Sequence, residues 1–299
     1  MFEGIILKAL SGFYYVDTEK GLIECHARGL FRKKCDSPLV GDRVKIEILS
    51  DGTGVIKEIL DRKNSLVRPP VANVDKIFIV SSYSTPAPNT LVIDTMTAIA
   101  EDKGIEPIIV FNKCDMGSFD DISEVYKKCG YSVYVVSAND GIGTDLLKNE
   151  LYNSISVFAG NTGVGKSSLL NSLFGNLELK TGEVSEKLGR GRHTTRHVQL
   201  FSFADNCFVA DTPGFSSLDL EDSDLIFKDN LQFSFREFDY FIGKCKFTSC
   251  THTGEKGCAV LNALENGDIP QSRYESYKLL YSELSKKKDW EIKKQFSKK

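Results

Sequence analysis

The chain has 299 residues, of which 41% are hydrophobic and 26% charged, with a formal net charge of −3. This is the composition of an ordinary globular protein, and the length suits two or three domains. No apolar run approaches the roughly 20 residues that span a bilayer, and the N-terminus lacks the features of a signal peptide, so we expect a cytoplasmic protein without a membrane partner.

Residues 1–66 predict a small all-β barrel. Glycines separate five short β-rich runs, at residues 4–10, 13–17, 22–27, 43–49 and 54–59. Five strands in this length fit an OB-like barrel, a fold that often binds oligonucleotides. An OB-fold RNA-binding domain and a barrel with a purely structural role both remain open, because fold does not fix function.

Residues 67–225 predict a central α/β domain. The Arg68-Pro69-Pro70 sequence marks its start, because consecutive prolines interrupt regular elements. Expected strands at 76–80, 106–111, 132–136, 155–159 and 207–210 alternate with expected helices at 91–103, 121–129, 144–152 and 166–174. This alternation predicts a parallel sheet with helices on both faces, and ligands bind at the carboxyl ends of such strands.

Residues 226–299 predict a third, C-terminal domain with a lysine-rich helix over 271–294. Acidic side chains outnumber basic ones in residues 67–242, and basic ones outnumber acidic ones in residues 243–299. Such asymmetry is compatible with RNA binding at one end of the molecule. The run Lys286-Lys287-Lys288 also fits a solvated helix face.

Residues 160–167 read Gly-Asn-Thr-Gly-Val-Gly-Lys-Ser and follow an expected strand. This is the pattern of a phosphate-binding loop, whose glycines bring backbone N–H groups close to phosphates. We expect Lys166 to contact the β and γ phosphates, where it contributes to catalysis, and Ser167 to bind Mg²⁺. The predicted GTP-binding residues here are Gly160, Asn161, Thr162, Gly163, Val164, Gly165, Lys166, Ser167 and Ser168.

A second motif, Asn112-Lys113-Cys114-Asp115, follows another expected strand and predicts recognition of guanine. A carboxylate at Asp115 can accept hydrogen bonds from guanine N1–H and the exocyclic amine, whereas adenine would leave it unpaired. Asn112 would brace the loop and Lys113 would lie across the base. Ser137-Ala138 matches a second base-reading loop. Helix capping is the alternative role of Asp115.

A third motif, Asp211-Thr212-Pro213-Gly214, follows the strand at 207–210 and predicts a metal-dependent switch. Asp211 would hold Mg²⁺ together with Ser167 and Thr195, with Thr194 as the alternative to Thr195. The Gly214 N–H would bind the γ-phosphate of GTP, so that loss of this phosphate releases the segment that carries the motif.

The residue after Gly214 is Phe215, where many GTPases have a glutamine that orients water. Phenylalanine cannot orient water by hydrogen bonding, so we expect slow intrinsic hydrolysis. His193, in the glycine-rich stretch 189–196, is the internal candidate for this catalytic role, because an imidazole can orient water. A histidine that faces RNA or solvent is the alternative.

Four metal-ligating side chains occur within 14 residues, namely Cys245, Cys250, His252 and Cys258. Three thiolates and one imidazole form a closed tetrahedral site, which is typical of structural zinc. Because the spacing is not the common Cys-x2-Cys, the sequence supports a metal more firmly than zinc itself. The remaining cysteines are scattered and predict buried thiols.

The base-reading motif precedes the phosphate loop, which is the reverse of the usual order, and the switch motif comes last. With the barrel, the Gly-Arg-His-Thr-Thr stretch at 191–195 and the Cys₃His cluster, this order resembles a circularly permuted GTPase family, ribosome small-subunit-dependent GTPase A (RsgA or YjeQ). The resemblance covers nearly the whole chain.

The resemblance implies slow GTP hydrolysis that the small (30S) ribosomal subunit stimulates. It implies action late in the maturation of that subunit and release of an assembly factor. It also implies rRNA contacts by the barrel and the zinc domain, with contacts from Arg190, Arg192, Arg196 and His197. The expected ligands are GTP or GDP with Mg²⁺ and one structural Zn²⁺, and the expected state is a monomer.

Two other functions remain compatible with the sequence. The protein could be an RNA-binding module in which nucleotide only stabilises the fold, or a permuted GTPase that serves another RNA or protein. The particle that accelerates GTP hydrolysis discriminates between them.

Overall fold

The computed structural model describes residues 1–27, 37–67, 69–83, 87–175, 198–211 and 226–286. These residues form two compact units. Unit 1 draws its described residues from 1–77, 141–159 and 166–211, and unit 2 draws its from 78–140, 160–165 and 226–286. Within these ranges, no helix is both long enough and apolar enough to cross a bilayer.

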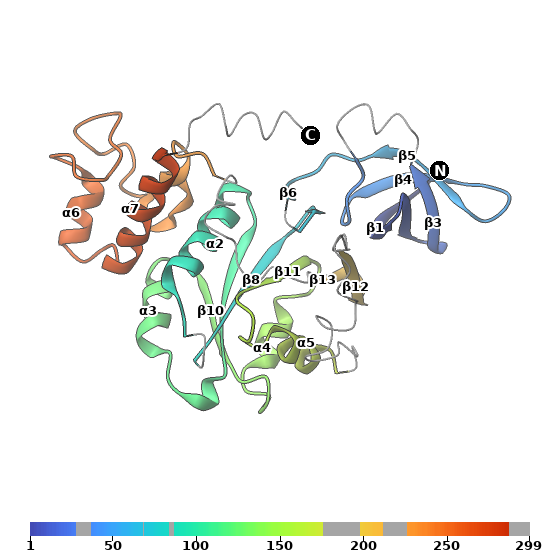
Figure 1. Cartoon of the computed structure of the whole chain (residues 1–299), viewed down its shortest axis with the longest axis horizontal. Coiled ribbons are helices and arrows are strands. Elements are labelled where there is room, and N and C mark those ends of the chain that lie inside the picture. Colours follow the sequence, from blue (N-terminus) through green and yellow to red (C-terminus); the bar gives the residue numbers. More distant parts are fainter. Residues whose placement is uncertain (28–36, 68, 84–86, 176–197, 212–225, 287–299) are drawn as a thin grey trace. The chain divides into compact units, whose positions relative to one another are not determined.

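Unit 1 contains a closed five-stranded barrel (Figure 1). Its strands are β1 (Phe2–Leu10), β2 (Phe13–Thr18), β3 (Gly21–Ala27), β4 (Arg43–Ile48) and β5 (Gly54–Ile59). β1 pairs with β2, β2 with β3, β3 with β5 in parallel, β5 with β4, and β4 again with β1. This closed order is that of an OB-fold barrel, which confirms the predicted fold of the N-terminal part.

The barrel interior follows from the alternation of side chains along each strand. Ile6, Val16, Ile46 and Ile56 are fully buried. At Gly54 two strands approach closely, and a Cβ atom there would lie 2.5 Å from Cys25 Sγ. A side chain at residue 54 would therefore force the strands apart.

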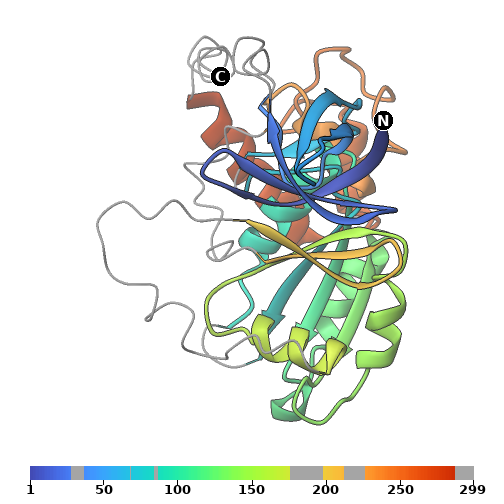
Figure 2. The same cartoon turned by 90° about the vertical axis from the view of Figure 1, so that its right-hand side faces the viewer.

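Unit 1 continues into three strands of the α/β part. β11 (Ile155–Ala159) runs parallel to β13 (Cys207–Asp211), and β12 (Gln199–Ala204) forms an antiparallel hairpin with β13. β12 also pairs with β1, at Gln199 and Lys8, so the hairpin lies beside the barrel (Figure 2). Two helices, α4 (Thr144–Asn149) and α5 (Lys166–Phe174), pack against each other.

The segment that follows β5, residues 60–75, is hydrogen-bonded to the barrel on one side and to β11 on the other. It contains the short hairpin of β6 (Ser65–Leu66) and β7 (Val71–Ala72). Asn73 Nδ2 donates to the Gly41 carbonyl at 3.0 Å on the barrel side, and the Ile155 N–H donates to Asp75 Oδ2 at 2.8 Å on the β11 side. Within unit 1 the barrel is thus held to the strand that precedes the phosphate loop.

Unit 2 contains the strands β10 (Ser132–Val136), β9 (Glu106–Asn112) and β8 (Lys76–Ser82), in that order, with the first two residues of β8 in unit 1. β9 and β10 are parallel. Helices α2 (Thr90–Asp102) and α3 (Asp120–Lys128) lie on the same face of these strands (Figure 1). The apolar runs of β8 and β9 are buried almost throughout, as expected of strands in the middle of a parallel sheet.

The C-terminal part of unit 2 comprises η3 (Leu231–Ser234), η4 (Arg236–Phe238), α6 (Ala259–Glu265) and α7 (Gln271–Lys286). Phe235, Phe238 and Tyr277 form the centre of its core, with ring centroids 4.8–5.4 Å apart. The same core includes Ala98 and Ile99 of α2. This segment therefore shares its apolar interior with a helix of the α/β part.

Three features differ from the sequence prediction. β12 was not expected, and because it is antiparallel the sheet is mixed rather than purely parallel. α6 was also not expected. The helix predicted over 144–152 ends at Asn149, and the left-handed backbone of Asn153 (φ 52°) then turns the chain into β11.

Candidate nucleotide site and metal centre

Asn112, the last residue of β9, connects three loops of unit 2. Its Nδ2 donates to the Val164 carbonyl of the phosphate loop at 3.0 Å, and its Oδ1 accepts from the Ala138 N–H at 3.1 Å. The side chain is 1% exposed, so these bonds are protected from water. The two base-reading loops and the phosphate loop are consequently held together by one amide.

Lys113 adds a second connection to the phosphate loop. Its Nζ donates to the Gly163 carbonyl at 2.9 Å. Its backbone is left-handed (φ 65°), which ends β9 sharply and leads into the short helix η1 (Cys114–Met116). Asp115 lies in η1 and is exposed, which is compatible with its predicted contact with a base.

Two positions of the phosphate loop have no room for a side chain and therefore require glycine. Gly160 has φ 139°, and a Cβ atom there would lie 2.1 Å from the Val80 carbonyl oxygen. Gly165 has φ 92°, and its Cβ would lie 2.4 Å from Asn112 Nδ2. These glycines let the loop lie against β8 and against Asn112 at the end of β9.

In unit 1, the N-terminus of α5 and the end of β13 lie at the same edge of the sheet. Lys166 and Ser167 open α5 directly after the loop, and Asp211 is the last residue of β13. Because β11 and β13 are parallel neighbours, both connections leave at their carboxyl ends. Burial lowers the pKa of Lys166 to about 8, and an anionic phosphate beside it would favour its charged form.

Several predicted residues lie outside the described residues, namely His193, Thr194, Thr195 and Gly214, together with Arg190, Arg192, Arg196, His197 and Phe215. Their contacts with nucleotide, Mg²⁺ or RNA remain predictions. The same holds for the ligand contacts of Ser137, Asn161, Thr162 and Ser168, which the structure does describe.

We expect Gly165→Ala to lower GTP affinity by at least about tenfold, because an overpacked loop costs roughly 1–3 kcal/mol and the added methyl would displace Asn112 Nδ2. The measurement is nucleotide titration with a fluorescent GTP analogue. Gly130→Ala is the matched control, since Gly130 has a similar φ of 84° but open space around its Cβ position. Equal affinity losses in both variants would contradict this steric account.

The four predicted metal ligands converge in unit 2. The sulfur atoms of Cys245, Cys250 and Cys258 lie 3.5, 3.5 and 3.3 Å from His252 Nδ1. The sulfur atoms of Cys245 and Cys258 are 3.9 Å apart, and all four ligand atoms lie within 4.8 Å of one another. A tetrahedron with metal–sulfur bonds of about 2.3 Å has ligand separations of about 3.8 Å, so this set fits one Zn²⁺-sized ion.

The orientation of His252 suits metal binding through Nδ1. Its Nε2 lies 2.9 Å from Gln232 Oε1 of η3, which can accept a hydrogen bond from the Nε2–H and thereby fix the ring. Cys245 Sγ accepts from the Ala259 N–H at 3.3 Å, at the start of α6. Burial raises the pKa of Cys250 to about 12 and lowers that of His252. A bound cation would be needed to keep the thiol ionised.

The loop between the ligands is fixed by Glu255 and by two tyrosines of α7. Glu255 accepts from the N–H groups of Thr251 and Thr253 at 2.7 and 2.9 Å. Tyr274 and Tyr277 donate to the His252 and Thr251 carbonyls at 3.0 and 2.8 Å. The loop that carries the four ligands is thus bonded to the core of the C-terminal part of unit 2, which supports a structural role for the metal.

Sequence reasoning missed Gln232 and the two tyrosines as partners of this site. Nothing in the sequence marks Gln232, which precedes the first ligand by 13 positions and belongs to a single turn of 3₁₀-helix. The tyrosines lie three residues apart on α7, a spacing that predicts one shared face but not what that face contacts.

Known proteins match the chain almost end to end. Residues 59–221 match the family model described as RsgA GTPase, and residues 3–56 match that described as RsgA N-terminal domain. A relative from Caldanaerobacter subterraneus subsp. tengcongensis, named Small ribosomal subunit biogenesis GTPase RsgA, is 47% identical over 95% of this chain and 96% of its own length. A relative of the same name from Halalkalibacterium halodurans is 44% identical over 93% and 95%.

Solved structures agree. The crystal structure of YjeQ from Thermotoga maritima has a TM-score of 0.80 at 36% identity and covers 96% of this chain and 99% of that one. The structure of YloQ, described as a circularly permuted GTPase, has a TM-score of 0.79 at 35% identity, with 96% of each chain covered.

The fold and the order of the motifs define a circularly permuted GTPase with an N-terminal barrel, an enzyme that hydrolyses GTP. The chain belongs to the RsgA GTPase family.

Proposed function

We propose that this GTPase acts in the late maturation of the small ribosomal subunit. On its own the protein hydrolyses GTP slowly, and the subunit accelerates this hydrolysis. The protein in turn helps to release an assembly factor from the subunit. The similarity over 95% of the chain to a relative named for small-subunit biogenesis carries this proposal. We further propose that the protein acts as a cytoplasmic monomer, with one structural Zn²⁺ at the Cys₃His site and Mg²⁺ bound together with GTP.

The hydrogen bonds of Asn112 and Lys113 to the phosphate loop support a single site for base and phosphates. In this proposal Asp115 reads guanine, Lys166 contacts the β and γ phosphates, and Ser167 and Asp211 hold Mg²⁺ together with Thr195. The ion would neutralise charge on the phosphates. Because Phe215 cannot orient water, hydrolysis is slow until His193 or the ribosomal subunit supplies that contact.

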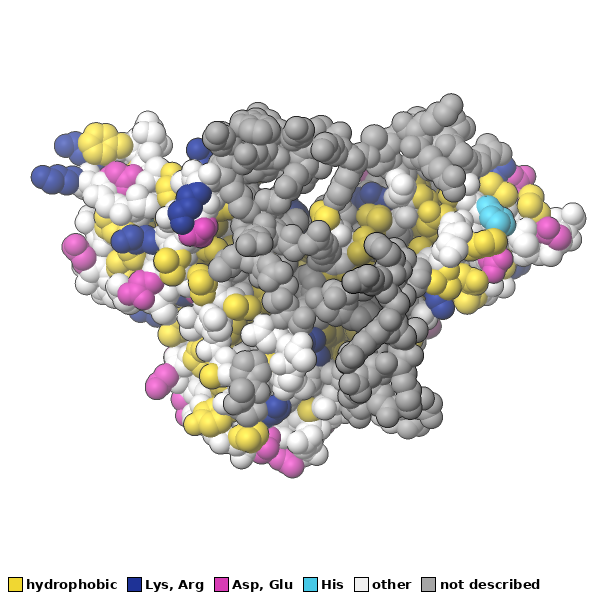
Figure 3. All heavy atoms as spheres, viewed as in Figure 1, with side chains coloured by type: hydrophobic (Ala, Val, Ile, Leu, Met, Phe, Trp, Pro, Cys, Tyr) yellow, Lys and Arg dark blue, Asp and Glu magenta, His cyan; other side chains and the backbone are white. Residues whose placement is uncertain are grey.

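Exposed aromatic and lysine side chains near the metal centre support a contact with rRNA. Lys244 Nζ lies 3.1 Å from the centroid of the Tyr240 ring, and Lys246 Nζ lies 5.6 Å from that of Phe247. Tyr240 is 74% and Phe247 50% exposed. At the upper left of Figure 3, lysine or arginine and hydrophobic side chains lie close together, with acidic side chains among them. Unpaired bases stack on such rings while lysines neutralise phosphate.

GTP turnover with and without purified small subunits tests the proposal. We expect a low rate alone, strong acceleration by small subunits and no acceleration by large subunits. Lys166→Ala should abolish turnover in both conditions. Hydrolysis that small subunits do not accelerate would contradict the proposed function, even if the protein binds GTP.

A double variant, Tyr240→Ala with Lys244→Ala, tests the RNA-contacting surface. We expect about tenfold weaker binding of small subunits, since one stacked base is worth roughly 1–3 kcal/mol, while the turnover rate at saturating subunit is retained. The matched control replaces by alanine Lys148 of α4 and Tyr152, which follows the end of that helix; the pair has the same composition and spacing in reverse order. Equal losses in the two double variants would argue against a specific surface at Tyr240 and Lys244.

A further inference from the structure

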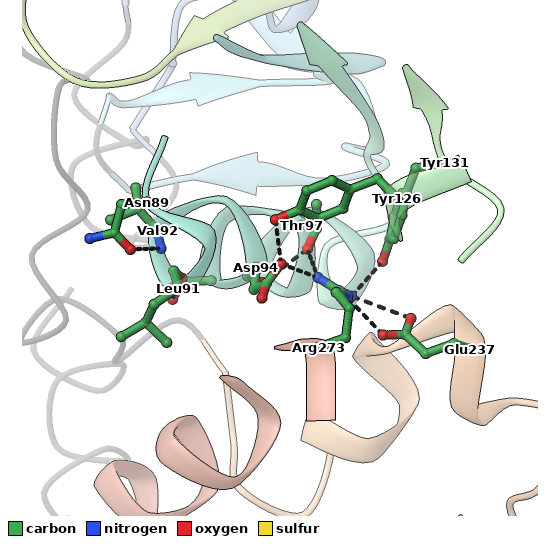
Figure 4. Close-up of polar contacts among 10 residues, drawn as sticks. Asn89, Leu91, Val92, Asp94, Thr97, Tyr126, Tyr131, Glu237 and Arg273 are labelled. Carbon is green, nitrogen blue, oxygen red and sulfur yellow. Dashed lines mark hydrogen bonds and ion pairs between the residues drawn. The ribbon is translucent and has the colours of Figure 1, made fainter. Parts of the chain in front are cut away.

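The first turns of helix α2 and the phosphate loop line the same small cavity. Val92, Ile93 and Met96 of α2, with its N-cap residue Asn89, line a small cavity together with Gly160, Asn161 and Val164. The Asn89 side chain caps the helix by accepting from the Val92 N–H at 3.3 Å (Figure 4). The position of the α2 N-terminus therefore determines which side chains lie beside the phosphate loop at this cavity.

The same helix is held by an arginine of the C-terminal segment (Figure 4). Arg273, on α7, donates to Asp94 Oδ1 at 2.7 Å and to Thr97 Oγ1 at 3.1 Å, both on α2. Ile93, which lines the cavity, and Thr97 lie one turn apart on one face of the helix. α2 therefore connects Arg273 of α7 with the cavity beside the phosphate loop.

The Arg273 side chain is completely buried and extensively bonded. Its Nε donates to Glu237 Oε1 at 2.7 Å and its Nη2 to the Tyr131 hydroxyl at 3.2 Å. The Tyr126 hydroxyl in turn donates to Asp94 Oδ1 at 2.9 Å. Arg273 and Asp94 are each 0% exposed and Glu237 is 4% exposed at the side chain. A buried ion pair of this kind favours one geometry, because any shift leaves a charge without its partner.

We propose that Arg273 is a positioning residue for the GTPase reaction. By fixing α2 from the C-terminal segment, it sets the α2 N-terminus against the phosphate loop in the geometry that binds GTP. The metal-bearing segment and the nucleotide are then energetically coupled through α2, and such coupling is reciprocal. The inference rests on the proposed function, since it requires that the loop bind GTP.

Nucleotide titration of full-length Arg273→Met tests the proposal. We expect GTP affinity to fall about tenfold, a size typical of coupling between sites, while the chain keeps its metal. Arg273→Lys, which can retain a single ionic contact, should show an intermediate loss. Tyr131→Phe removes one hydrogen bond of Arg273 without touching α2 and should bind GTP as the wild type does.

The reciprocal measurement is the rate at which the protein loses its metal to a colorimetric chelator. We expect a nonhydrolysable GTP analogue to slow metal loss from the wild type several-fold, and to have no effect on Arg273→Met. A merely structural role of Arg273 would speed metal loss in the variant but leave its response to nucleotide intact.

The triple variant Asp94→Asn, Glu237→Gln, Arg273→Met keeps the test valid if the single variant unfolds, because it removes all three buried charges together. The inference would be overturned if the folded triple variant bound GTP as tightly as the wild type. It would also be overturned if the rate of metal loss from the wild type did not change when nucleotide binds. A wild-type protein that does not bind GTP would instead refute the proposed function.

Discussion

We expect Asp115→Asn to convert the protein from a GTP-binding into a xanthosine-triphosphate-binding one. In the proposed site the carboxylate would accept from guanine N1–H and from the exocyclic amine, and each charge-assisted bond is worth about 2 kcal/mol, so GTP affinity should fall about a thousandfold. The asparagine amide can instead donate to the C2 carbonyl of xanthine and accept from its N1–H. Titration with fluorescent analogues of both nucleotides measures the exchange.

Asp121→Asn is the matched control for this substitution. Asp121 is an exposed carboxylate in the first turn of α3, six positions after Asp115. Its variant should bind GTP as tightly as the wild type and xanthosine triphosphate as poorly. If Asp115→Asn still prefers GTP, the motif at 112–115 does not read the base.

We expect Cys250→Ala to remove the metal and unfold the C-terminal part of unit 2. Structural zinc contributes roughly 10–16 kcal/mol in small zinc-binding peptides, so losing one buried ligand should cost on the order of 5 kcal/mol or more. The Phe235–Phe238–Tyr277 core packs directly around the ligands. Metal analysis should change from about one ion per chain to almost none, with loss of helical circular dichroism from α6 and α7.

Cys25→Ala controls for the loss of a buried thiol. Cys25 is fully buried in the barrel, away from any described metal ligand. Its variant should keep the full metal content and lose only about 1 kcal/mol through a small cavity. A Cys250→Ala protein that retains its metal and its helices would show that the Cys₃His cluster is not a structural metal site.

Features that depend on residues close together in the chain could be predicted from the sequence. The loop at 160–167 needs glycine where β8 and Asn112 approach it, and those glycines are visible in the sequence. The four metal ligands lie within 14 residues, so local spacing suffices to group them. The five barrel strands are separated by turn glycines and were found for the same reason.

Contacts between distant segments could not be predicted. Arg273 and Asp94 are 179 positions apart, and nothing in α7 distinguishes an arginine that becomes buried from one that remains in water. The side chain of Gln232 meets His252 from a turn that has no regular pattern. No element was predicted at 199–204, and the pairing of these residues with β13 and β1 makes them the strand β12.

The pairing of β1 with β12 bears on how much of a sheet border is exposed. A strand at the border of a sheet exposes unpaired N–H and C=O groups, which can recruit the same strand of another molecule. β1 pairs with β12 at Lys8 and Gln199, the first residue of β12. The barrel therefore occupies one end of this border, and a chain without the barrel would expose the whole of β12 to pairing with other molecules.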